Sequence, residues 1–273
     1  MAPLHQIAAA VCLVAFSGLK PASAASQVYK FEAVQVDDAA YLAANLARNG
    51  KLPVHIEEVT KDEGLVSSVQ KTVTTTETTV PQGREAIDKE SCEALIKAST
   101  LKDIFHYTFE YKESPNYREL LQAALEAGLK VFDNNKYPSD WKTVWANDAG
   151  GSLAYLLWSK STNIGCVIGK CTKTAASADG MGDSKQRDDS GRISSEATQT
   201  TPAVLFCQLD PAPTKDQAPF DEEYFTGLIT RTAKLADMTA DDLKAPTNDA
   251  AAAAALPPIL SAGLIAMLAA VSV

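Results

Sequence analysis

Cysteine is the residue type in this sequence whose spacing points most directly to chemistry. The chain holds five cysteines: Cys12, which lies in an apolar N-terminal run, and Cys92, Cys166, Cys171 and Cys207. An even set of four remains once the N-terminal run is set aside, and such a set in a secreted chain indicates disulfides. We therefore expect two disulfides, and four cysteines allow three ways of pairing them.

A zinc site is the alternative interpretation of these cysteines. Structural zinc sites pair their ligands at short spacing, as in C-x(2)-C, and no such pair occurs here. His55 and His106 are also isolated from the cysteines along the chain. His106 and Glu110 can share one face of a strand, but a lone histidine in a core is commoner than a metal ligand. Disulfides are the favoured interpretation, and no metal site is predicted.

The motifs of the common enzyme classes are absent from the sequence. A serine nucleophile in a G-x-S-x-G turn, a glycine-rich phosphate loop and an H-E-x-x-H helix all fail to appear. A cysteine nucleophile would need a free thiol beside a histidine, and pairing uses all four thiols. The sequence therefore predicts no catalytic residue and no cofactor site.

Composition and charge limit the class of protein and of partner. The chain has 273 residues, of which 46% are hydrophobic and 22% are charged, as in a globular protein with one main domain. Its formal net charge is −9, and its lysines and arginines are scattered. Nucleic acid is excluded as an expected partner, because phosphate binding needs a basic patch.

Both ends of the chain have the pattern of processing signals. The apolar run 7–16 is too short to span a bilayer, and Ala22-Ser23-Ala24 supplies the small residues of a signal-peptidase site. At the other end, an alanine-rich spacer leads into the apolar run 259–273, which no charge follows. This order of small residues, spacer and hydrophobic tail is typical of a glycosylphosphatidylinositol (GPI) attachment signal.

The expected division of the chain follows from these signals. Residues 1–24 are a signal peptide, 25–244 the ectodomain, 245–248 a short stalk and 249–273 a propeptide that is removed. Asn248 is the expected GPI acceptor, with Asp249 as the alternative. A transmembrane tail is the competing interpretation, but the run is short and no basic stop-transfer cluster follows it. The predicted location is the outer leaflet of the plasma membrane.

Helical periodicity and capping residues predict four main helices. Apolar residues recur on one face at helical spacing, and Asp, Ser-Pro and Gly mark the ends. Cys92 falls on the buried face of its helix, and Trp141 and Trp145 are interpreted as core residues. The expected helices are 37–50, 85–98, 114–128 and 221–235, with a last short turn from Thr239.

Strands are expected where side chains alternate or apolar residues form short runs. Alternation over 104–111 predicts a strand with His106 on its more polar face. The apolar runs predict a strand at 152–158 that ends in Trp158, a strand carrying Cys166 and Cys171, and a strand at 203–211 carrying Cys207. The polar segment 57–84 is expected to be an exposed loop or edge ribbon, and 172–201 an exposed loop; together they are the expected contact surface.

The residues around the last three cysteines resemble a known family. A segment ending in Trp158, then I-G-C-x(4)-C from Ile164, then V-x-x-C-x-x-D-P from Val204, is similar to the C-terminal core of the CAP superfamily of cysteine-rich secretory proteins, antigen 5 and PR-1. With both end signals, the chain looks most like a surface antigen (SAG) of the coccidian parasite Eimeria. Many CAP proteins place a metal-cluster histidine six residues before the Trp, where this chain has Ser152, so their zinc chemistry is not carried over.

The resemblance implies a fold, a pairing of cysteines and a role. The fold is an α/β (α+β) three-layer α/β/α sandwich with a mostly antiparallel, CAP-like sheet. The pairs are Cys166 with Cys207 and Cys92 with Cys171, and the same pairing follows if the two strands are neighbours in the sheet.

The predicted function is that of a non-enzymatic, GPI-anchored parasite surface antigen. Its expected partners are the membrane, a host-cell surface and host antibodies. A secreted CAP-type lipid or sterol carrier is the alternative, and a hydrolase is the least favoured.

Overall fold

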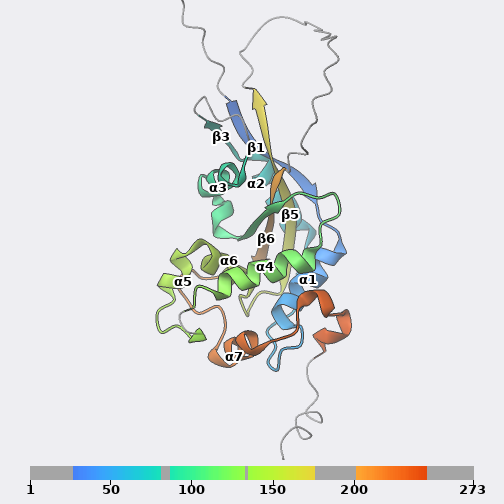
Figure 1. Cartoon of the computed structure of the whole chain (residues 1–273), viewed down its shortest axis with the longest axis vertical. Coiled ribbons are helices and arrows are strands. Elements are labelled where there is room, and N and C mark those ends of the chain that lie inside the picture. Colours follow the sequence, from blue (N-terminus) through green and yellow to red (C-terminus); the bar gives the residue numbers. More distant parts are fainter. Residues whose placement is uncertain (1–26, 81–86, 133–134, 176–200, 245–273) are drawn as a thin grey trace, which may run out of the picture.

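A computed structural model describes residues 27–80, 87–132, 135–175 and 201–244 (Figure 1). The predicted signal peptide, stalk, GPI acceptor and propeptide lie outside these ranges. So do residues 81–84 and 176–200 of the two polar segments, and residues 85–86 at the start of the predicted helix 85–98. None of the helices within the four ranges is long and apolar enough to cross a membrane.

The architecture is a mixed α/β fold around one sheet of six strands in the described chain. Five strands follow the order β3-β1-β5-β6-β4, each antiparallel to its neighbour, and β2 pairs in parallel with the start of β5. The strands are β1 (Gln27–Gln35), β2 (Thr60–Lys61), β3 (Glu77–Val80), β4 (Phe105–Glu110), β5 (Asn163–Ala175) and β6 (Pro202–Asp210). The prediction of an α+β fold with a mostly antiparallel sheet is confirmed.

Helices cover both faces of this sheet. On one face α2 packs against β5 and β1, and α3 packs against β6 and β4; on the other, α6 packs against β4 and β6, with α1 and α4 beside it. The other helical elements of the described residues are α5, α7 and three 3₁₀ turns. The bounds are α1 (Asp38–Asn49), α2 (Glu63–Thr75), α3 (Lys89–Lys97), η1 (Thr100–Asp103), α4 (Tyr117–Leu129), α5 (Lys142–Ala146), α6 (Asp148–Leu156), α7 (Glu222–Thr230), η3 (Leu235–Asp237) and η4 (Ala240–Leu243).

The predicted helices with clear caps are present. Asp37 caps α1 by accepting a hydrogen bond from the Ala39 amide, and Asp221 caps α7 in the same way from Tyr224. In α4 the cap is Asn116, two residues after the predicted Ser114. The alternating strand is also confirmed as β4, and Trp141 and Trp145 are both buried as predicted.

The predicted strand at 152–158 is wrong, because this segment is helix α6 and the turn that follows it. Asn147 caps the helix by accepting from the amides of Ala149 and Gly150. Every α6 residue from Gly150 to Leu156 is buried. A helix buried on all sides shows no polar face, so its sequence cannot be told from that of a buried strand by periodicity.

The prediction of an exposed loop or edge ribbon over 57–84 is confirmed only for β3, which is an edge strand of the sheet, because most of the segment is helix α2. The threonine-rich stretch forms α2, capped by Asp62, with Val66, Val69 and Val73 buried against the sheet. Its threonines bond back to carbonyls one turn earlier, as Thr76 does to Thr72, which satisfies their hydroxyls within the helix. Three valines at helical spacing are enough to seat a helix once a sheet lies beneath them.

Two further segments are more regular than predicted. The stretch before α1 is the nine-residue strand β1, which lies in the middle of the sheet between β3 and β5. β5 continues past Cys171 to Ala175, so residues 172–175 are strand rather than loop. Both extensions exist because each strand supplies the other's backbone hydrogen bonds, a long-range pairing that local pattern does not encode.

Candidate functional site

The strongest candidate site lies along the outer edge of β4, the last strand of the sheet. The Ser152 hydroxyl of α6 accepts a hydrogen bond from the His106 amide at 3.0 Å and donates to the His106 carbonyl at 2.7 Å. These groups point away from β6, and alternate residues of a strand direct their backbone groups to the same edge. The backbone N–H and C=O of Thr108 therefore face the same way.

A cavity of about 410 Å³ opens beside this edge. Its walls come from both helical layers, since α3 contributes on one side and α4, α5 and α6 on the other. Apolar contacts include Ile96, Ala127 and the rings of Trp145 and Tyr155. Its volume is within the usual range for small-molecule sites.

His106 is the histidine that lines the cavity. Its Nδ1 lies 2.9 Å from the Ile104 carbonyl oxygen, which can only accept, so Nδ1 carries the hydrogen and Nε2 presents a lone pair. Burial lowers the pKa of His106 below its ordinary value, and the hydrogen bond to Ile104 only partly opposes this effect. The imidazole is therefore neutral at pH 7.

The sequence placed His106 and Glu110 on one face of a strand, but they do not form a metal site. Glu93, Asp103 and Asp148 are the carboxylates whose charges reach His106, each as a minor influence on its pKa. No group of three or more His, Cys, Asp or Glu among the described residues is arranged to hold a metal ion. His55 lies elsewhere, with Nε2 bonded to the Leu52 carbonyl at 3.1 Å.

Two aromatic residues form the rigid wall of the cavity. The Trp145 and Tyr155 rings meet edge to face with centroids 5.0 Å apart, and the Trp145 indole N–H donates to the Gln217 carbonyl at 2.8 Å. Burial raises the pKa of Tyr155 to about 12, with a smaller contribution from Asp103. The phenol is therefore protonated at neutral pH, and no other described residue accepts its hydrogen.

The rim of the cavity is charged, with more positive groups than negative ones. Lys97 lies 3.7 Å from Asp148, and Lys89 lies 4.0 Å from Glu93. Both pairs are exposed to solvent and weak. Lys102 and Lys215 also line the rim, and neither forms an ion pair with another described residue. The cavity thus offers donors and cations to a bound molecule.

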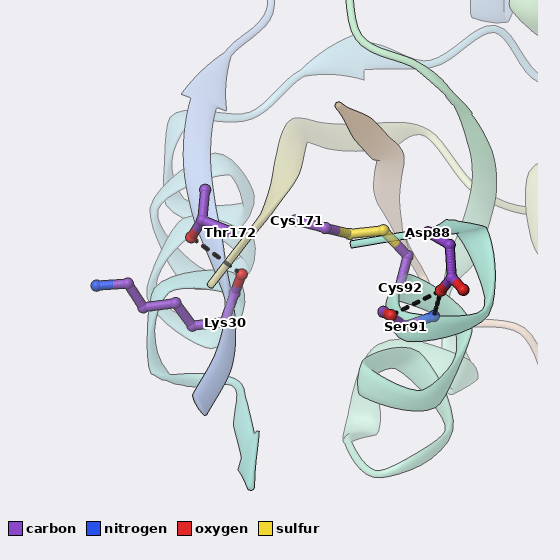
Figure 2. Close-up of a disulfide and its surroundings, with 6 residues drawn as sticks. All are labelled: Lys30, Asp88, Ser91, Cys92, Cys171 and Thr172. Atoms are coloured by element: carbon purple, nitrogen blue, oxygen red, sulfur yellow. Dashed lines mark hydrogen bonds between the residues drawn. A yellow bond between two sulfur atoms is a disulfide. The ribbon is translucent and has the colours of Figure 1, made fainter. Parts of the chain in front are cut away.

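The cysteines lie at a separate place in the molecule, inside the sheet and its α3 layer. Cys166 on β5 and Cys207 on β6 are directly opposite each other, with Cα atoms 4.1 Å apart, and are joined by a disulfide. Cys92 on α3 is joined to Cys171 on β5, with Cα atoms 5.8 Å apart (Figure 2). These are the two pairs that the family resemblance implies.

The surroundings of the second disulfide fix the start of α3 (Figure 2). Asp88 accepts hydrogen bonds from the Ser91 amide at 2.8 Å and from the Ser91 hydroxyl at 2.7 Å. The neighbour of Cys171, Thr172, donates to the Lys30 carbonyl of β1 at 3.3 Å. The disulfide therefore joins a capped helix to the centre of the sheet, and the cysteines are structural rather than reactive.

Sequence reasoning missed two residues that organise this part of the chain. Ser152 was noted only as standing where CAP proteins have a histidine, yet its hydroxyl holds the edge of β4. Arg48 was not singled out, yet its side chain is completely buried and donates to four backbone carbonyls. Arg48 lies opposite the apolar face that the sequence indicates for the 37–50 helix, Ala39, Leu42, Ala43 and Leu46, so the helical pattern gave no signal for it.

Comparison with known proteins gives distant likenesses. No protein-family model matches the sequence, and no curated protein matches it. Among solved structures, the crystal structure of the Eimeria tenella surface antigen protein SAG19 is similar with a TM-score of 0.40 and 16% identity, over 73% of this chain and 97% of that chain. Hookworm platelet inhibitor is similar with a TM-score of 0.37 and 12% identity, over 69% of this chain and 79% of that chain. Neither likeness is close enough to carry a function across.

Proposed function

We propose that this chain is a non-enzymatic surface antigen of a parasite, held on the outer leaflet by a GPI anchor. In this proposal residues 25–244 are the CAP-like ectodomain, and Asn248, or alternatively Asp249, carries the lipid. The exposed ectodomain contacts the host-cell surface and is seen by host antibodies. The end signals that support the anchor are features of the sequence and lie outside the described residues.

The observation that carries this proposal is the pair of buried disulfides. Each joins cysteines that are almost completely buried, and together they use all four cysteines of the expected mature chain. Disulfides of this kind form in the secretory pathway and persist outside the cell, whereas cytosolic thiols stay reduced. They support a destination on the cell surface.

The layout of the domain supports display on a membrane. β1, β3 and β5 place Gln27, Val80 and Ala175 side by side, because Gln27 pairs with both of the others. These strand ends lie at one end of the long axis, whereas α7 lies at the other, with the last described residues in that half (Figure 1). An anchor just after residue 244 would leave the strand ends farthest from the membrane.

Phosphatidylinositol-specific phospholipase C tests the anchor. Treatment of intact cells should release the protein. Mass spectrometry should then find a C-terminal peptide that ends at Asn248 or Asp249 and carries the glycan and inositol phosphate of the anchor, without its lipid. A matched control replaces residues 249–273 by a transmembrane segment, which the enzyme should leave in place. If the native protein stays on the cells and its last peptide contains Val273, a transmembrane tail replaces the GPI anchor in this proposal.

Host attachment is tested by charge reversal at the two ends of the domain. Glu77 on β3 is exposed beside the strand ends, and Glu223 on α7 is exposed at the opposite end. Glu77→Lys should weaken binding of the purified ectodomain to host cells, while Glu223→Lys, with the same change of charge, should leave it unchanged. Equal binding by both variants would place the contact surface elsewhere.

A further inference from the structure

We propose that the cavity at the outer edge of β4 binds a small organic anion with a planar apolar body, such as an aromatic carboxylic acid. The site is distinct from the disulfides and from the strand ends. It also holds whether or not the protein carries a lipid anchor, so the two proposals stand or fall separately.

Charge is the first argument for an anion. The whole chain carries a formal net charge of −9, yet the cavity is lined by four lysines, Lys89, Lys97, Lys102 and Lys215, against the three carboxylates of Glu93, Asp103 and Asp148. A local excess of positive charge on an acidic protein attracts anions to that place. Of these four cavity lysines, Lys102 and Lys215 have no ion-pair partner among the described residues, so they are the cations available to a ligand.

Hydrogen-bond donors deeper in the cavity support the same chemistry. The Tyr155 hydroxyl is protonated and has no acceptor among the other described residues, and the outward Thr108 amide faces the same space. A carboxylate accepts from both kinds of donor and gains more from them than a neutral group does. The neutral His106 offers Nε2 as an acceptor, which suits a ligand hydroxyl beside the acid group.

The aromatic wall selects the body of the ligand. Trp145 is held at its N–H by Gln217 and at its ring by Tyr155, so the wall keeps its shape without a ligand. Ile96 and Ala127 add apolar surface. A planar ring gains contact with such a wall at little cost in conformational entropy, because both surfaces are rigid.

An extended peptide is a poorer fit to this edge. Strand addition requires a run of free backbone groups, and Ser152 already occupies those of His106. Only alternate residues of the six-residue strand β4 direct their backbone N–H and C=O groups to the outer edge. What is left near Thr108 is too short to anchor a strand, but it is sufficient for one carboxylate.

Isothermal titration calorimetry with 2-naphthoate tests the proposal on the full chain, expressed through a secretory host and purified in detergent. The acid should bind saturably, and its neutral analogue 2-naphthamide should bind about tenfold more weakly. Lys102→Gln with Lys215→Gln should weaken binding of the acid about fivefold. Tyr155→Phe should weaken it about tenfold, because a hydrogen bond to a charged group is lost.

A matched control separates this site from general charge. Lys130→Gln with Lys160→Gln removes two exposed lysines outside the cavity and should leave binding of the acid unchanged. Near-ultraviolet circular dichroism should be the same for all variants, so that weaker binding is not a folding defect. Equal affinity for acid and amide, equal loss in the control, or no saturable heat with millimolar acid would each overturn the proposal.

Discussion

The disulfide-linked sheet and the helical end of the molecule are held together by different interactions. The sheet region, β1, β5 and β6 with α2 and α3, contains both disulfides and the backbone ladders between its strands. The helical end, formed by the C-terminus of α1 with α7 and the turn after α6, contains no cysteine. There, the buried Arg48 and the partly buried Arg231 donate to backbone carbonyls.

Arg48 is the centre of the helical end. Its guanidinium donates to the carbonyls of Glu57, Leu156, Trp158 and Ser161, at distances from 2.6 to 3.3 Å. Burial lowers its pKa to about 10, so it is still protonated at neutral pH. No carboxylate is among its hydrogen-bond partners. A buried cation is tolerated here because converging carbonyl dipoles replace its water.

Arg231 repeats this device at the end of α1. It follows α7 and donates to the carbonyls of Leu46, Ala47 and Gly50, each at 3.2 Å. The buried hydroxyl of Tyr224 donates to the Arg48 carbonyl. These bonds satisfy carbonyls that a helix C-terminus leaves without partners, and positive charge is favourable there. The comparison teaches that the sheet region depends on the redox state of the compartment, whereas the helical end does not.

Removing the Cys92–Cys171 disulfide should have the largest effect, and it should destabilise the sheet region and not the helical end. With a separation of 79 residues, Cys92→Ala with Cys171→Ala should lower the free energy of unfolding by about 4.5 kcal/mol in the chain-entropy model. Urea denaturation measures it. The Cys166–Cys207 pair spans 41 residues and should cost slightly less, about 4 kcal/mol. A larger loss from the Cys166–Cys207 pair would contradict the entropic account.

Arg48→Met should break the helical end and leave the disulfides intact. Four buried carbonyls lose their donor, which we expect to lower the free energy of unfolding by about 3 to 4 kcal/mol. The half-buried Arg118 of α4 is the control, and Arg118→Met should cost well under 1 kcal/mol. Hydrogen exchange should rise first in the turn after α6. Faster exchange in β5 instead would mean that the two regions are not separate.

Gly165→Ala should sharpen the comparison by loosening α2 from the sheet. A Cβ at Gly165 would lie 2.4 Å from the Val66 amide nitrogen, so the helix must shift, at about 2 kcal/mol. Gly64→Ala is the control, because its Cβ meets only the Asp62 carboxylate, at 3.0 Å, and should be near neutral. Thermal unfolding of both variants measures the difference, and equal midpoints would show that α2 is not tightly seated.

Ser152→Ala should have a smaller effect, at the boundary between the sheet and α6. The outward amide and carbonyl of His106 lose their common partner, which should cost about 1.5 kcal/mol. Ser67→Ala removes an exposed hydroxyl from α2 and should cost a few tenths at most. Protection of the His106 amide against hydrogen exchange should fall in Ser152→Ala alone; unchanged protection would mean that another group holds this edge.

His106 should give the smallest effect, visible only as a dependence on pH. Its pKa is lowered in the folded protein by burial, so between that pKa and the unfolded value of about 6.5 the unfolded chain binds more protons. Stability should therefore fall as the pH drops through this window. The thermal midpoint should therefore fall less between pH 7.5 and pH 5.5 in His106→Gln than in the wild-type protein. Glu93, Asp103, Asp148 and the rim lysines contribute equally to the change in both proteins. An identical change in both would contradict the lowered pKa.

The sequence by itself determined the elements that have local signals. Polar caps and one apolar face were enough to predict α1, α3, α4 and α7, and alternation was enough for β4, because both patterns are set by neighbours in the chain. The cysteine pairing followed from the family resemblance, and the burial of Trp141 and Trp145 followed from their spacing. The end signals are also local, and the lipid anchor stays a prediction.

Only the tertiary structure decided the elements whose partners are far away in sequence. The apolar segment at 152–158 became a helix because α4, α5 and the strands β4 and β6 surround it. The threonine-rich segment became α2 because β1 and β5 gave its three valines a surface. β1 became a central strand through pairs more than 130 residues distant. Arg48 and Ser152 act on backbone groups that long-range packing brings to them, and backbone groups are the same in every residue. No side-chain pattern in the sequence can therefore predict such contacts. The same holds for the cavity that forms where the two helical layers pass the edge of β4.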